Sequence, residues 1–336
     1  MNSVLDNKDN KLIVSVSYRP KKEEIEIIKN ELLEFKEYKL NIFFLYELKN
    51  DERLDILKKT DILITFFPKK ELNEEELMIL RNSNNLKLVQ CILSGIDHID
   101  ADLFPNAKVL GNKGGYASIM SEHIFGFILY FAKNIQKNHE NLKKGIYNQN
   151  TDNILLKDKI LGILGYGEIG REVAKLAKAF KMYVIGINTT GKTDDKSIDE
   201  LYTMKKLDYI LKNSDILLIS LPLTNETENL INYEKLNLMK KNAILVNVGR
   251  GKIINQRDLY YFLKENVEFK VALDVWWKEP AFNEPFELDY PFFELPNFLG
   301  SPHITALTNE TFKIRTKNYV NLIKKFIKDE MLRGVA

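Results

Sequence analysis

The sequence contains one cysteine and no long hydrophobic run, and both shortages limit what the protein can be. Cys91 has no second cysteine to pair with, which excludes an internal disulfide and a cysteine-based metal cluster. The most apolar stretch, residues 124–132, is much too short to cross a bilayer. Residues 1–10 lack the apolar core of a signal peptide. We therefore expect a cytoplasmic protein with neither a metal centre nor a membrane partner.

An excess of charge of one sign is also lacking. The 49 Lys and Arg residues against 47 Asp and Glu give a formal net charge of +2, and no basic stripe with interleaved aromatic residues occurs. A nucleic-acid partner is therefore not expected. With 45% apolar and 29% charged residues, the 336-residue chain has the composition of a globular protein and the length of two ordinary domains.

Short apolar segments alternate with helical patterns along the whole chain, which predicts parallel sheets built from βαβ units. In the first part, strands are expected at 12–17, 41–45, 61–66, 86–92 and 107–110, with helices at 21–36, 51–59 and 73–82. In the second part, strands are expected at 160–164, 183–187, 216–221, 243–248, 271–275 and 298–300. An apolar helix at 118–135 precedes this second set, followed by a polar loop, and an amphipathic helix at 309–328 closes the chain.

A glycine-rich turn follows the strand expected at 160–164. The chain reads Gly165-x-Gly167-x-x-Gly170, and a helix-forming run begins directly afterwards. Such glycines allow a tight turn, close approach of the backbone to a pyrophosphate, and close packing of the helix on the strand. The N–H groups at the start of the helix then face the phosphates. The motif predicts a dinucleotide site.

Six parallel strands that open on this motif make a complete doubly wound sheet, and the first hundred residues make a smaller sheet. We therefore expect an α/β protein with two lobes. Residues 114–303 are expected to form a Rossmann-type, dinucleotide-binding lobe. Residues 1–113 with 304–336 are expected to form a smaller, flavodoxin-like lobe that binds the substrate.

The end of the strand at 183–187 bears on the choice of cofactor. An acidic residue at this place binds the ribose 2′-hydroxyl of NAD, but the chain has Asn188 followed by Thr189, Thr190 and Lys192. No carboxylate is present in the turn to repel a 2′-phosphate, so NADP is slightly favoured. Because an asparagine can also bond a ribose hydroxyl, NAD stays open.

Arg250, Glu279 and His303 each follow one of the last three expected strands, at the edge where open parallel sheets bind ligands. Arg250 can form a forked pair with a carboxylate. His303 can donate a proton to a carbonyl oxygen as hydride reaches the carbon, while Glu279 orients the imidazole and favours its protonated form. The trio suits reduction of a 2-keto acid.

Each of these residues, taken alone, has an ordinary structural interpretation. An arginine after a strand usually forms a surface ion pair, and a glutamate before proline is usually a loop carboxylate. The other histidines are interpreted structurally, with His139 on a solvated helix face and His98 and His123 beside apolar segments.

Several further motifs occur in one order along the chain. They are Gly165–Gly170, Pro222-Leu-Thr224, Met239-Lys240, Val246–Gly251, Leu273-Asp-Val275, Glu279-Pro280 and Ser301-Pro-His303, preceded by Ser94-Gly-Ile-Asp97 and Ser121-Glu-His123. With this set, the chain resembles the D-isomer specific 2-hydroxyacid dehydrogenase family over about residues 86–310. Asp274 and Glu279 are five residues apart, as in that family.

The resemblance implies an NAD(P)-dependent oxidoreductase that interconverts a small 2-keto acid and a D-2-hydroxy acid. It implies that Arg250 anchors the substrate, that His303 is the acid/base, and that Glu279 is its partner. Asp274 would meet the carboxamide of the nicotinamide. The other implied cofactor contacts are Glu168, Ile169, Leu221, Pro222, Thr227, Val248 and Gly249, and the backbone of Ser94, Gly95 and Ile96 would bind the substrate carboxylate. Family members are generally homodimers built through the cofactor domain, so a homodimer is expected.

Three features depart from the family pattern. Asn188 replaces the usual aspartate, which puts NAD preference in doubt, and Ser220 stands where many members carry histidine. The segment 281–293 is long for its place between Glu279 and His303, so the loop that shapes the substrate pocket is expected to differ.

Two rival interpretations stay open. A non-catalytic, dinucleotide-sensing protein, like the corepressors that share this fold, would bind the dinucleotide but turn over no 2-keto acid. The intact trio of Arg250, Glu279 and His303 argues against this interpretation. Formate dehydrogenases resemble the family but have glutamine where Glu279 stands.

Among keto acids, glyoxylate or hydroxypyruvate is favoured, because the chain ends about thirty residues after His303 and leaves no room for the regulatory domain of many phosphoglycerate dehydrogenases. Phosphoglycerate dehydrogenase is kept as an alternative.

Overall fold

The computed structural model of the protein describes residues 11–35, 38–96, 98–150, 152–280 and 285–334. Residues 1–10, Asp97 of the Ser94-Gly-Ile-Asp97 motif and residues 281–284 of the long segment after Glu279 lie outside the described residues. The chain divides into two compact units, Met1–Tyr116 with Thr308–Ala336, and Ala117–Leu307. Which unit binds which ligand stays a prediction at this point.

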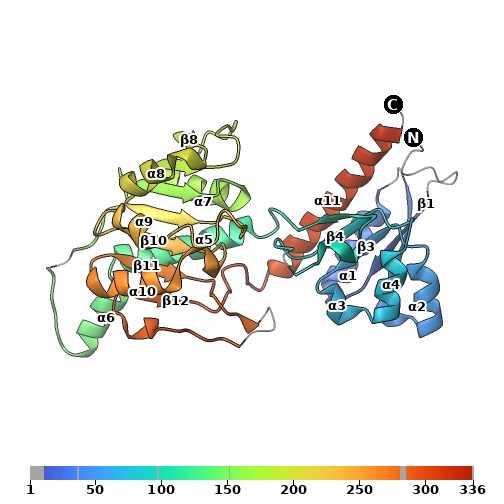
Figure 1. The fold of residues 1–336 in the computed structure, drawn as a ribbon, viewed down its shortest axis with the longest axis horizontal. Coiled ribbons are helices and arrows are strands. Elements are labelled where there is room, and N and C mark those ends of the chain that lie inside the picture. The colour runs from blue at the N-terminus through green and yellow to red at the C-terminus, as the bar shows by residue number, and fades with distance from the viewer. Residues whose placement is uncertain (1–10, 36–37, 97, 151, 281–284, 335–336) are drawn as a thin grey trace. The chain divides into compact units, whose positions relative to one another are not determined.

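The first unit is built on a five-stranded parallel sheet (Figure 1). Its strands are β1 (Lys11–Val16), β2 (Lys39–Phe44), β3 (Ile62–Thr65), β4 (Leu88–Cys91) and β5 (Lys108–Leu110). The spatial order β2-β1-β3-β4-β5 is that of flavodoxin-like folds. The fold predicted for the smaller unit is therefore confirmed.

The helices of the first unit include one from the far end of the chain. They are α1 (Lys22–Leu33), α2 (Asn50–Leu57), α3 (Pro68–Glu71), α4 (Glu74–Arg81) and α11 (Thr311–Gly334). Helix α11 packs against α1 and buries Tyr319, Val320 and Ile323 in the core formed with β1. An ion pair of 3.0 Å between Arg315 and the buried Glu24 joins the two helices, so the C-terminal segment completes this unit.

The second unit is built on a seven-stranded sheet in which every strand pair is parallel. Its strands are β6 (Ile160–Leu164), β7 (Tyr183–Ile187), β8 (Glu200–Tyr202), β9 (Ile216–Ile219), β10 (Ile244–Asn247), β11 (Lys270–Leu273) and β12 (Phe298–Gly300). The spatial order is β12-β11-β10-β9-β6-β7-β8, with the glycine turn after the interior strand β6. This is the doubly wound Rossmann order extended by one strand, so the predicted fold class is confirmed.

Two elements of the second unit were not predicted. Strand β8 pairs with β7 at the edge of the sheet, yet it has only three residues, each half-buried, and so has no apolar run to reveal it. Helix α6 (Ile135–Lys143) occupies part of the segment expected to be a polar loop, where only the solvated helix face expected for His139 indicated a helix. It has no buried residue, and Asn134 before it adopts a left-handed φ of 48° that separates it from the preceding helix.

The remaining helices of this unit cover the sheet. They are α5 (Ala117–Ala132), α7 (Glu168–Ala179), α8 (Leu207–Asn213), α9 (Tyr233–Asn237) and α10 (Gln256–Glu265). Strands β9 and β10 are buried along their full length, which explains their continuous apolar sequences.

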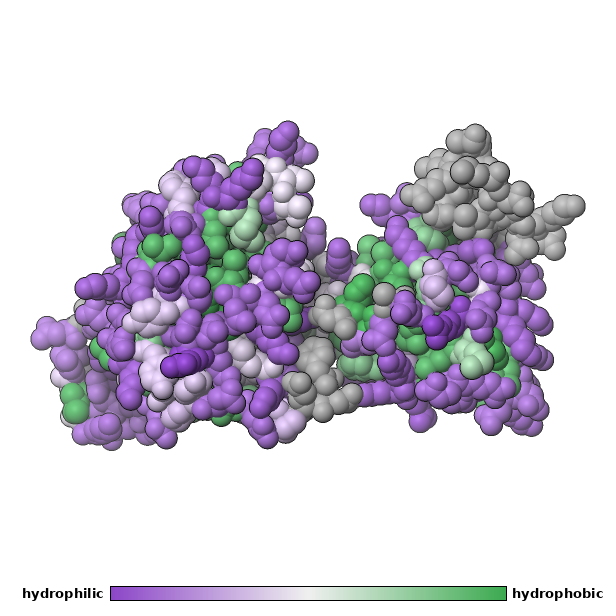
Figure 2. Space-filling model, in the orientation of Figure 1, coloured by the Kyte–Doolittle hydropathy of each residue, from purple (hydrophilic) through white to green (hydrophobic). Residues whose placement is uncertain are grey.

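Hydrophilic residues cover most of the face of each unit that Figure 2 shows. Among the described residues, no helix is long and apolar enough to cross a membrane.

Candidate active site

The three glycines of the turn after β6 are under different constraints. Gly165 has a φ of +99°, and a Cβ placed there would lie 2.9 Å from the carbonyl oxygen of Ser220. A Cβ on Gly167 would meet nothing within 4 Å, so the backbone there is open to a ligand. A Cβ on Gly170 would lie 2.9 Å from the carbonyl oxygen of Gly165, which requires close packing of helix and turn. A pyrophosphate needs this combination of a tight turn and an open approach.

The start of α7 is suited to phosphate. Gly167 is its N-cap residue and has no side chain that could occupy the first amides of the helix. Glu168 and Ile169 are the first helical residues, so their N–H groups belong to the unsatisfied first turn. The partial positive charge of a helix N-terminus adds to their attraction for an anion.

Asn188, after β7, folds its own turn. Its Oδ1 accepts hydrogen bonds from the N–H groups of Thr190 at 3.1 Å and Gly191 at 2.6 Å, and its Nδ2 donates to the carbonyl oxygen of Lys192 at 3.0 Å. The side chains of Thr189, Thr190 and Lys192 are exposed. The asparagine therefore shapes the turn, while its neighbours present hydroxyl and ammonium groups to solvent.

A carboxylate that sequence reasoning missed lies against the glycine turn. The hydroxyl of the buried Tyr166 donates to Oδ2 of Asp195 at 3.0 Å. Burial and this bond raise the pKa of Tyr166. Partial burial opposes ionisation of Asp195, but hydrogen bonds from Ser197 and Tyr166 outweigh it and lower the pKa of Asp195. The only sequence signal for Asp195 is its place in the loop between β7 and the unpredicted β8.

Two further turns meet beside the glycine turn, at the ends of β9 and β10. A Cβ on Gly249 would lie 2.6 Å from the carbonyl oxygen of Leu221, so these turns touch. In the turn after β9, the hydroxyl of Thr227 donates to the carbonyl oxygen of Pro222 at 2.7 Å. The N–H of Val248 donates to the carbonyl oxygen of Ile219 at 3.0 Å, which continues the pairing of the two strands.

The turn that carries Arg250 is held by a fully buried asparagine. Oδ1 of Asn247 accepts from the N–H of Gly249 at 3.0 Å, and its Nδ2 donates to the carbonyl oxygen of Arg250 at 3.0 Å. The half-buried guanidinium of Arg250 donates from Nη1 to the carbonyl oxygen of Gly249 at 2.8 Å. Asn247 therefore fixes the backbone from which the arginine projects, a role that the sequence did not reveal.

The segments after β11 and β12 bring the predicted acid/base pair together. Nδ1 of His303 lies 2.6 Å from Oε2 of Glu279, and Oε1 of Glu279 accepts from the N–H of Trp276 at 2.8 Å. The glutamate side chain is 5% exposed and the histidine side chain 37% exposed. A buried carboxylate on one ring nitrogen orients the ring and leaves Nε2 as the nitrogen that can face a ligand.

Asp274, at the end of β11, is fully buried. Its two oxygens accept hydrogen bonds from the side chains of Ser301 and Thr305 and from the N–H groups of Ile304 and Thr305. The structure thus gives this carboxylate partners in the loop of His303.

The first unit contains the segment expected to bind the substrate carboxylate. The hydroxyl of Ser94 donates to the carbonyl oxygen of Asn112 at 2.9 Å, and Gly111 packs against the backbone of Ser94. Gly95 and Ile96 follow in the same loop, after β4. His98, nearby, lies 2.9 Å from the carbonyl oxygen of Phe66, which is a structural contact.

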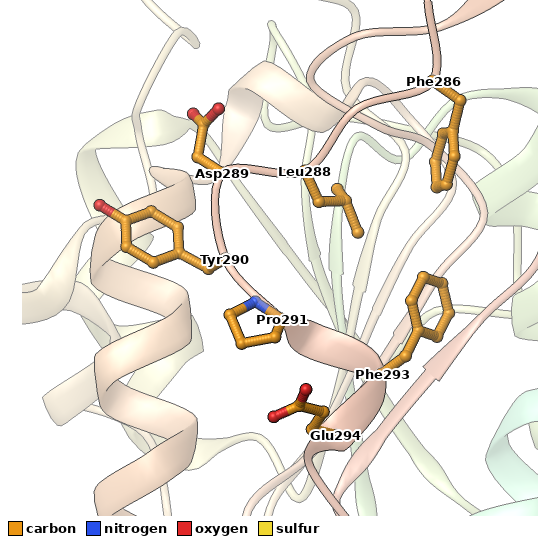
Figure 3. A pocket seen from close by; sticks show the side chains of 7 residues that line it. All are labelled: Phe286, Leu288, Asp289, Tyr290, Pro291, Phe293 and Glu294. Atoms are coloured by element: carbon orange, nitrogen blue, oxygen red, sulfur yellow. The ribbon is translucent and has the colours of Figure 1, made fainter.

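Residues within 286–294, in the long segment between Glu279 and His303, line a groove of about 490 Å³. Figure 3 shows the rings of Phe286 and Phe293 on one side of it, with Asp289, Tyr290 and Pro291 around the other. Both phenylalanine rings contact Trp276. Because no member of the Arg250, Glu279 and His303 trio lines this groove, it is a separate feature beside the site.

Comparison with known proteins shows which family has these site residues. The family model "D-isomer specific 2-hydroxyacid dehydrogenase, NAD binding domain" matches residues 125–305, a range that contains the glycine turn and the whole trio. The chain belongs to this family. It is an oxidoreductase that uses a nicotinamide dinucleotide and acts on the CH–OH group of 2-hydroxy acids. The resemblance and the enzyme class predicted from the motifs are confirmed.

Individual relatives cover most of the chain. D-3-phosphoglycerate dehydrogenase of Methanocaldococcus jannaschii is 31% identical over 86% of this chain and 54% of its own length. Glyoxylate reductase of Pyrococcus furiosus is 30% identical, over 79% of this chain and 78% of its own. Hydroxypyruvate reductase of Thermotoga maritima is also 30% identical, over 84% and 89%. The chain thus spans about half of the first relative and most of the other two.

Solved structures of the family are similar as well. A glycerate dehydrogenase related protein from Thermoplasma acidophilum matches 94% of this chain and 100% of its own, at 30% identity and a TM-score of 0.66. The D-lactate dehydrogenase of Aquifex aeolicus, solved with NAD and lactic acid, matches 95% of this chain and 96% of its own, at 27% identity and a TM-score of 0.68.

Proposed function

We propose that the protein reduces a small 2-keto acid, with glyoxylate or hydroxypyruvate favoured, to the D-2-hydroxy acid with NADPH or NADH. The 2.6 Å contact between Glu279 and His303 carries this proposal, because it provides an oriented acid on the same sheet edge as the glycine turn. The named activities of two relatives that the chain largely spans support the substrate class.

In this proposal, the trio divides the work of reduction. The guanidinium of Arg250 binds the substrate carboxylate and polarises the neighbouring carbonyl. His303 donates the proton from Nε2 to the carbonyl oxygen, and Glu279 stabilises the imidazolium that donates it. When bound, the reduced nicotinamide supplies the hydride, so the product gains one hydride and one proton.

The residues that would hold the cofactor fit a dinucleotide. Gly165, Gly167 and Gly170 shape the turn, and the open approach to Gly167 fits the pyrophosphate at the N-terminus of α7. Leu221, Pro222, Thr227, Val248 and Gly249 form the adjoining turns at the ends of β9 and β10 and would line the rest of the dinucleotide. The backbone of Ser94, Gly95 and Ile96 in the first unit, our proposed substrate-binding lobe, would bind the keto-acid carboxylate.

The cofactor is proposed to be NADPH at least as readily as NADH. The exposed Thr189, Thr190 and Lys192 offer donors for a 2′-phosphate, and Asn188 contributes no negative charge. Asp195, in the loop between β7 and β8, lies against the glycine turn, but its carboxylate already accepts a hydrogen bond from Tyr166. The expected bias toward NADPH is therefore modest.

A cytoplasmic homodimer is proposed for the assembly. Helix α6 and the segment after it expose apolar side chains, with Leu142 at 58% and Tyr147 at 78%. Covering such side chains by a second copy would remove apolar surface from water. Light scattering that gives twice the chain mass would support the dimer, and a monomer at micromolar concentration would contradict it.

The experiment that tests the function is a rate screen of glyoxylate, hydroxypyruvate, phosphohydroxypyruvate and pyruvate with NADH and NADPH. Replacing His303 with alanine should lower kcat by about 10²–10⁴-fold with little effect on cofactor affinity. A preference for phosphohydroxypyruvate would favour phosphoglycerate dehydrogenase, which the first relative's name also suggests. Binding of NAD(P)H without turnover of any keto acid would instead favour a corepressor-like sensor.

A further inference from the structure

Tyr166, the second residue of the glycine turn, contacts the chain after β7 at two places. Its N–H donates to the carbonyl oxygen of Ile187, the last residue of β7, at 2.7 Å. Its hydroxyl donates to Oδ2 of Asp195 at 3.0 Å. One residue of the dinucleotide turn therefore spans the segment between these two contacts, which contains Asn188 and Lys192.

The ring of Tyr166 is held between a helix and the sheet. A Cβ added to Gly170 in α7 or to Gly186 in β7 would lie 3.5 Å from the same ring carbon, so both elements pack closely on the ring. The tyrosine is 2% exposed. Its hydroxyl therefore has a fixed position, and the residue that it binds is held at a fixed distance from the glycine turn.

Residues 188–199, here called the specificity loop, connect β7 to β8 and contain neither a helix nor a strand. The loop has local hydrogen bonds, such as the one that Oδ1 of Asp195 accepts from the N–H of Ser197 at 2.8 Å. Among the described residues, no hydrogen bond other than that from Tyr166 joins residues 189–198 to the rest of the unit. This contact therefore holds the middle of the loop to the glycine turn.

The contact between the hydroxyl and the carboxylate is charge-assisted. Partial burial opposes ionisation of Asp195, but its hydrogen bonds from the N–H of Ser197 and the tyrosine hydroxyl, with the charge of Arg171 in α7, lower its pKa. A hydrogen bond to an ionised carboxylate is roughly twice as strong as one between neutral groups. The negative charge is thus engaged by groups of the protein, while the ammonium group of Lys192 in the same loop is exposed.

We propose that the bond between Tyr166 and Asp195 sets the choice of dinucleotide by holding the specificity loop beside the glycine turn. With the loop held there, Thr189, Thr190 and Lys192 can meet a 2′-phosphate while the pyrophosphate lies at the start of α7. Asp195 is then a positioning residue, which acts through the loop and not by contact with the cofactor. The inference rests on the proposed binding of NADPH at this turn.

Variants of the full-length protein test this contact. Tyr166→Phe removes the hydroxyl alone, Asp195→Ala removes the acceptor, and Asp195→Asn removes the charge but keeps an acceptor oxygen. Tyr233→Phe is the matched control, because the hydroxyl of Tyr233 donates to Glu265 at 2.5 Å between α9 and α10, which contain no predicted cofactor residue. The measurements are the Kd of NADPH and of NADH from fluorescence quenching, kcat with glyoxylate, and hydrogen exchange of the specificity loop without cofactor.

Tyr166→Phe should raise the Kd of NADPH about fivefold or more, the effect of one lost hydrogen bond, because the phosphate must then order the loop as it binds. The Kd of NADH should change by less than about twofold, since a ribose hydroxyl in place of the phosphate makes fewer contacts with the loop. The kcat at saturating cofactor should stay that of the parent, and the N–H of Ser197 should exchange faster.

The other variants separate position from charge. Asp195→Ala should behave like Tyr166→Phe, and the double variant should be no worse than either, because both changes remove the same bond. Asp195→Asn and Tyr233→Phe should lie close to the parent. Tighter binding of NADPH by Asp195→Asn than by the parent would overturn the inference, since Asp195 would then act by its charge on the phosphate.

Equal weakening of NADPH and NADH in Tyr166→Phe would also overturn the inference, because the glycine turn itself would then be disturbed. Parent-like Kd values for both dinucleotides would do the same, and Asp195→Ala decides the matter if Tyr166→Phe does not fold.

The parent protein separates this inference from the proposed function. A parent that binds both dinucleotides but reduces no keto acid would reject the proposed reduction, and the Kd values of the variants would still decide the inference. A parent that binds neither dinucleotide would reject the cofactor site and the inference with it. Active variants with an unchanged ratio of the two Kd values would reject only the role of Asp195.

Discussion

Replacing Gly251 with alanine should damage the site more than the size of one methyl group suggests. Gly251 directly follows Arg250, and a Cβ at this position would lie 2.7 Å from the backbone nitrogen of Trp277 and closer still to the carbonyl group of Trp276. Backbone atoms cannot rotate away as a side chain can. The methyl group would therefore push the turn of Arg250 away from the segment that carries Glu279.

The distances set the size of the effect. Ordinary van der Waals contact requires the two segments to separate by more than about 1 Å. A misplacement of about 1 Å in a catalytic arrangement can cost about 10²-fold in rate. Overpacking of a tight contact typically costs about 1–3 kcal/mol of stability. We expect Gly251→Ala to lower kcat/KM for the keto acid by about a hundredfold and to lower the unfolding temperature.

Steady-state kinetics and thermal unfolding of Gly251→Ala and Gly126→Ala would test this reasoning. Gly126 lies on the exposed face of α5, where an added Cβ would meet nothing within 4 Å. Its replacement should leave kcat unchanged and stabilise the helix by about 0.5–1 kcal/mol. If Gly251→Ala shows the kcat/KM and unfolding temperature of the parent, the contact between the two segments does not restrain the site.

Three further predictions concern single side chains. Glu279→Gln removes the carboxylate that lies 2.6 Å from Nδ1 of His303 and orients the ring, which should lower the turnover rate; an unchanged turnover rate would remove Glu279 from the mechanism. Asn188→Asp should keep the turn, because a carboxylate can accept the same two backbone hydrogen bonds, and should shift the ratio of kcat/KM values toward NADH by repelling a 2′-phosphate. A parent enzyme that prefers NADH by more than about tenfold, or about 1.4 kcal/mol, would contradict the bias toward NADPH. Burial raises the pKa of Cys91 to about 11, so the thiol should not react with a disulfide reagent at pH 8 until the protein is unfolded; rapid labelling of the native protein would show that β4 opens readily.

The sequence was a reliable guide wherever a local pattern carried the structural signal. Buried parallel strands such as β9 and β10 are apolar along their whole length, so they stand out as short runs between helical segments. The glycine turn could be read because a strand and a helix flank it at once. Strand β8 could not be read, because its three half-buried residues are defined by pairing with β7 and not by their own pattern.

The residues of the candidate site also divide into those that a local sequence pattern indicates and those that only the folded structure reveals. The sequence alone indicated Arg250, Glu279 and His303, because each chemically distinctive side chain follows the end of a strand. It could not show that Asp195 reaches the glycine turn, because that contact depends on how the loop after β7 folds back.

The sequence by itself determined the α/β class, the order of the strands' apolar segments, the dinucleotide turn and the family. Tertiary structure alone decided which polar groups meet, as when Asp274 bonds the loop of His303 about thirty residues further along the chain. The physical reason is that periodicity and glycine spacing record local geometry and burial, whereas a hydrogen bond between distant residues depends on the folded path of everything between them.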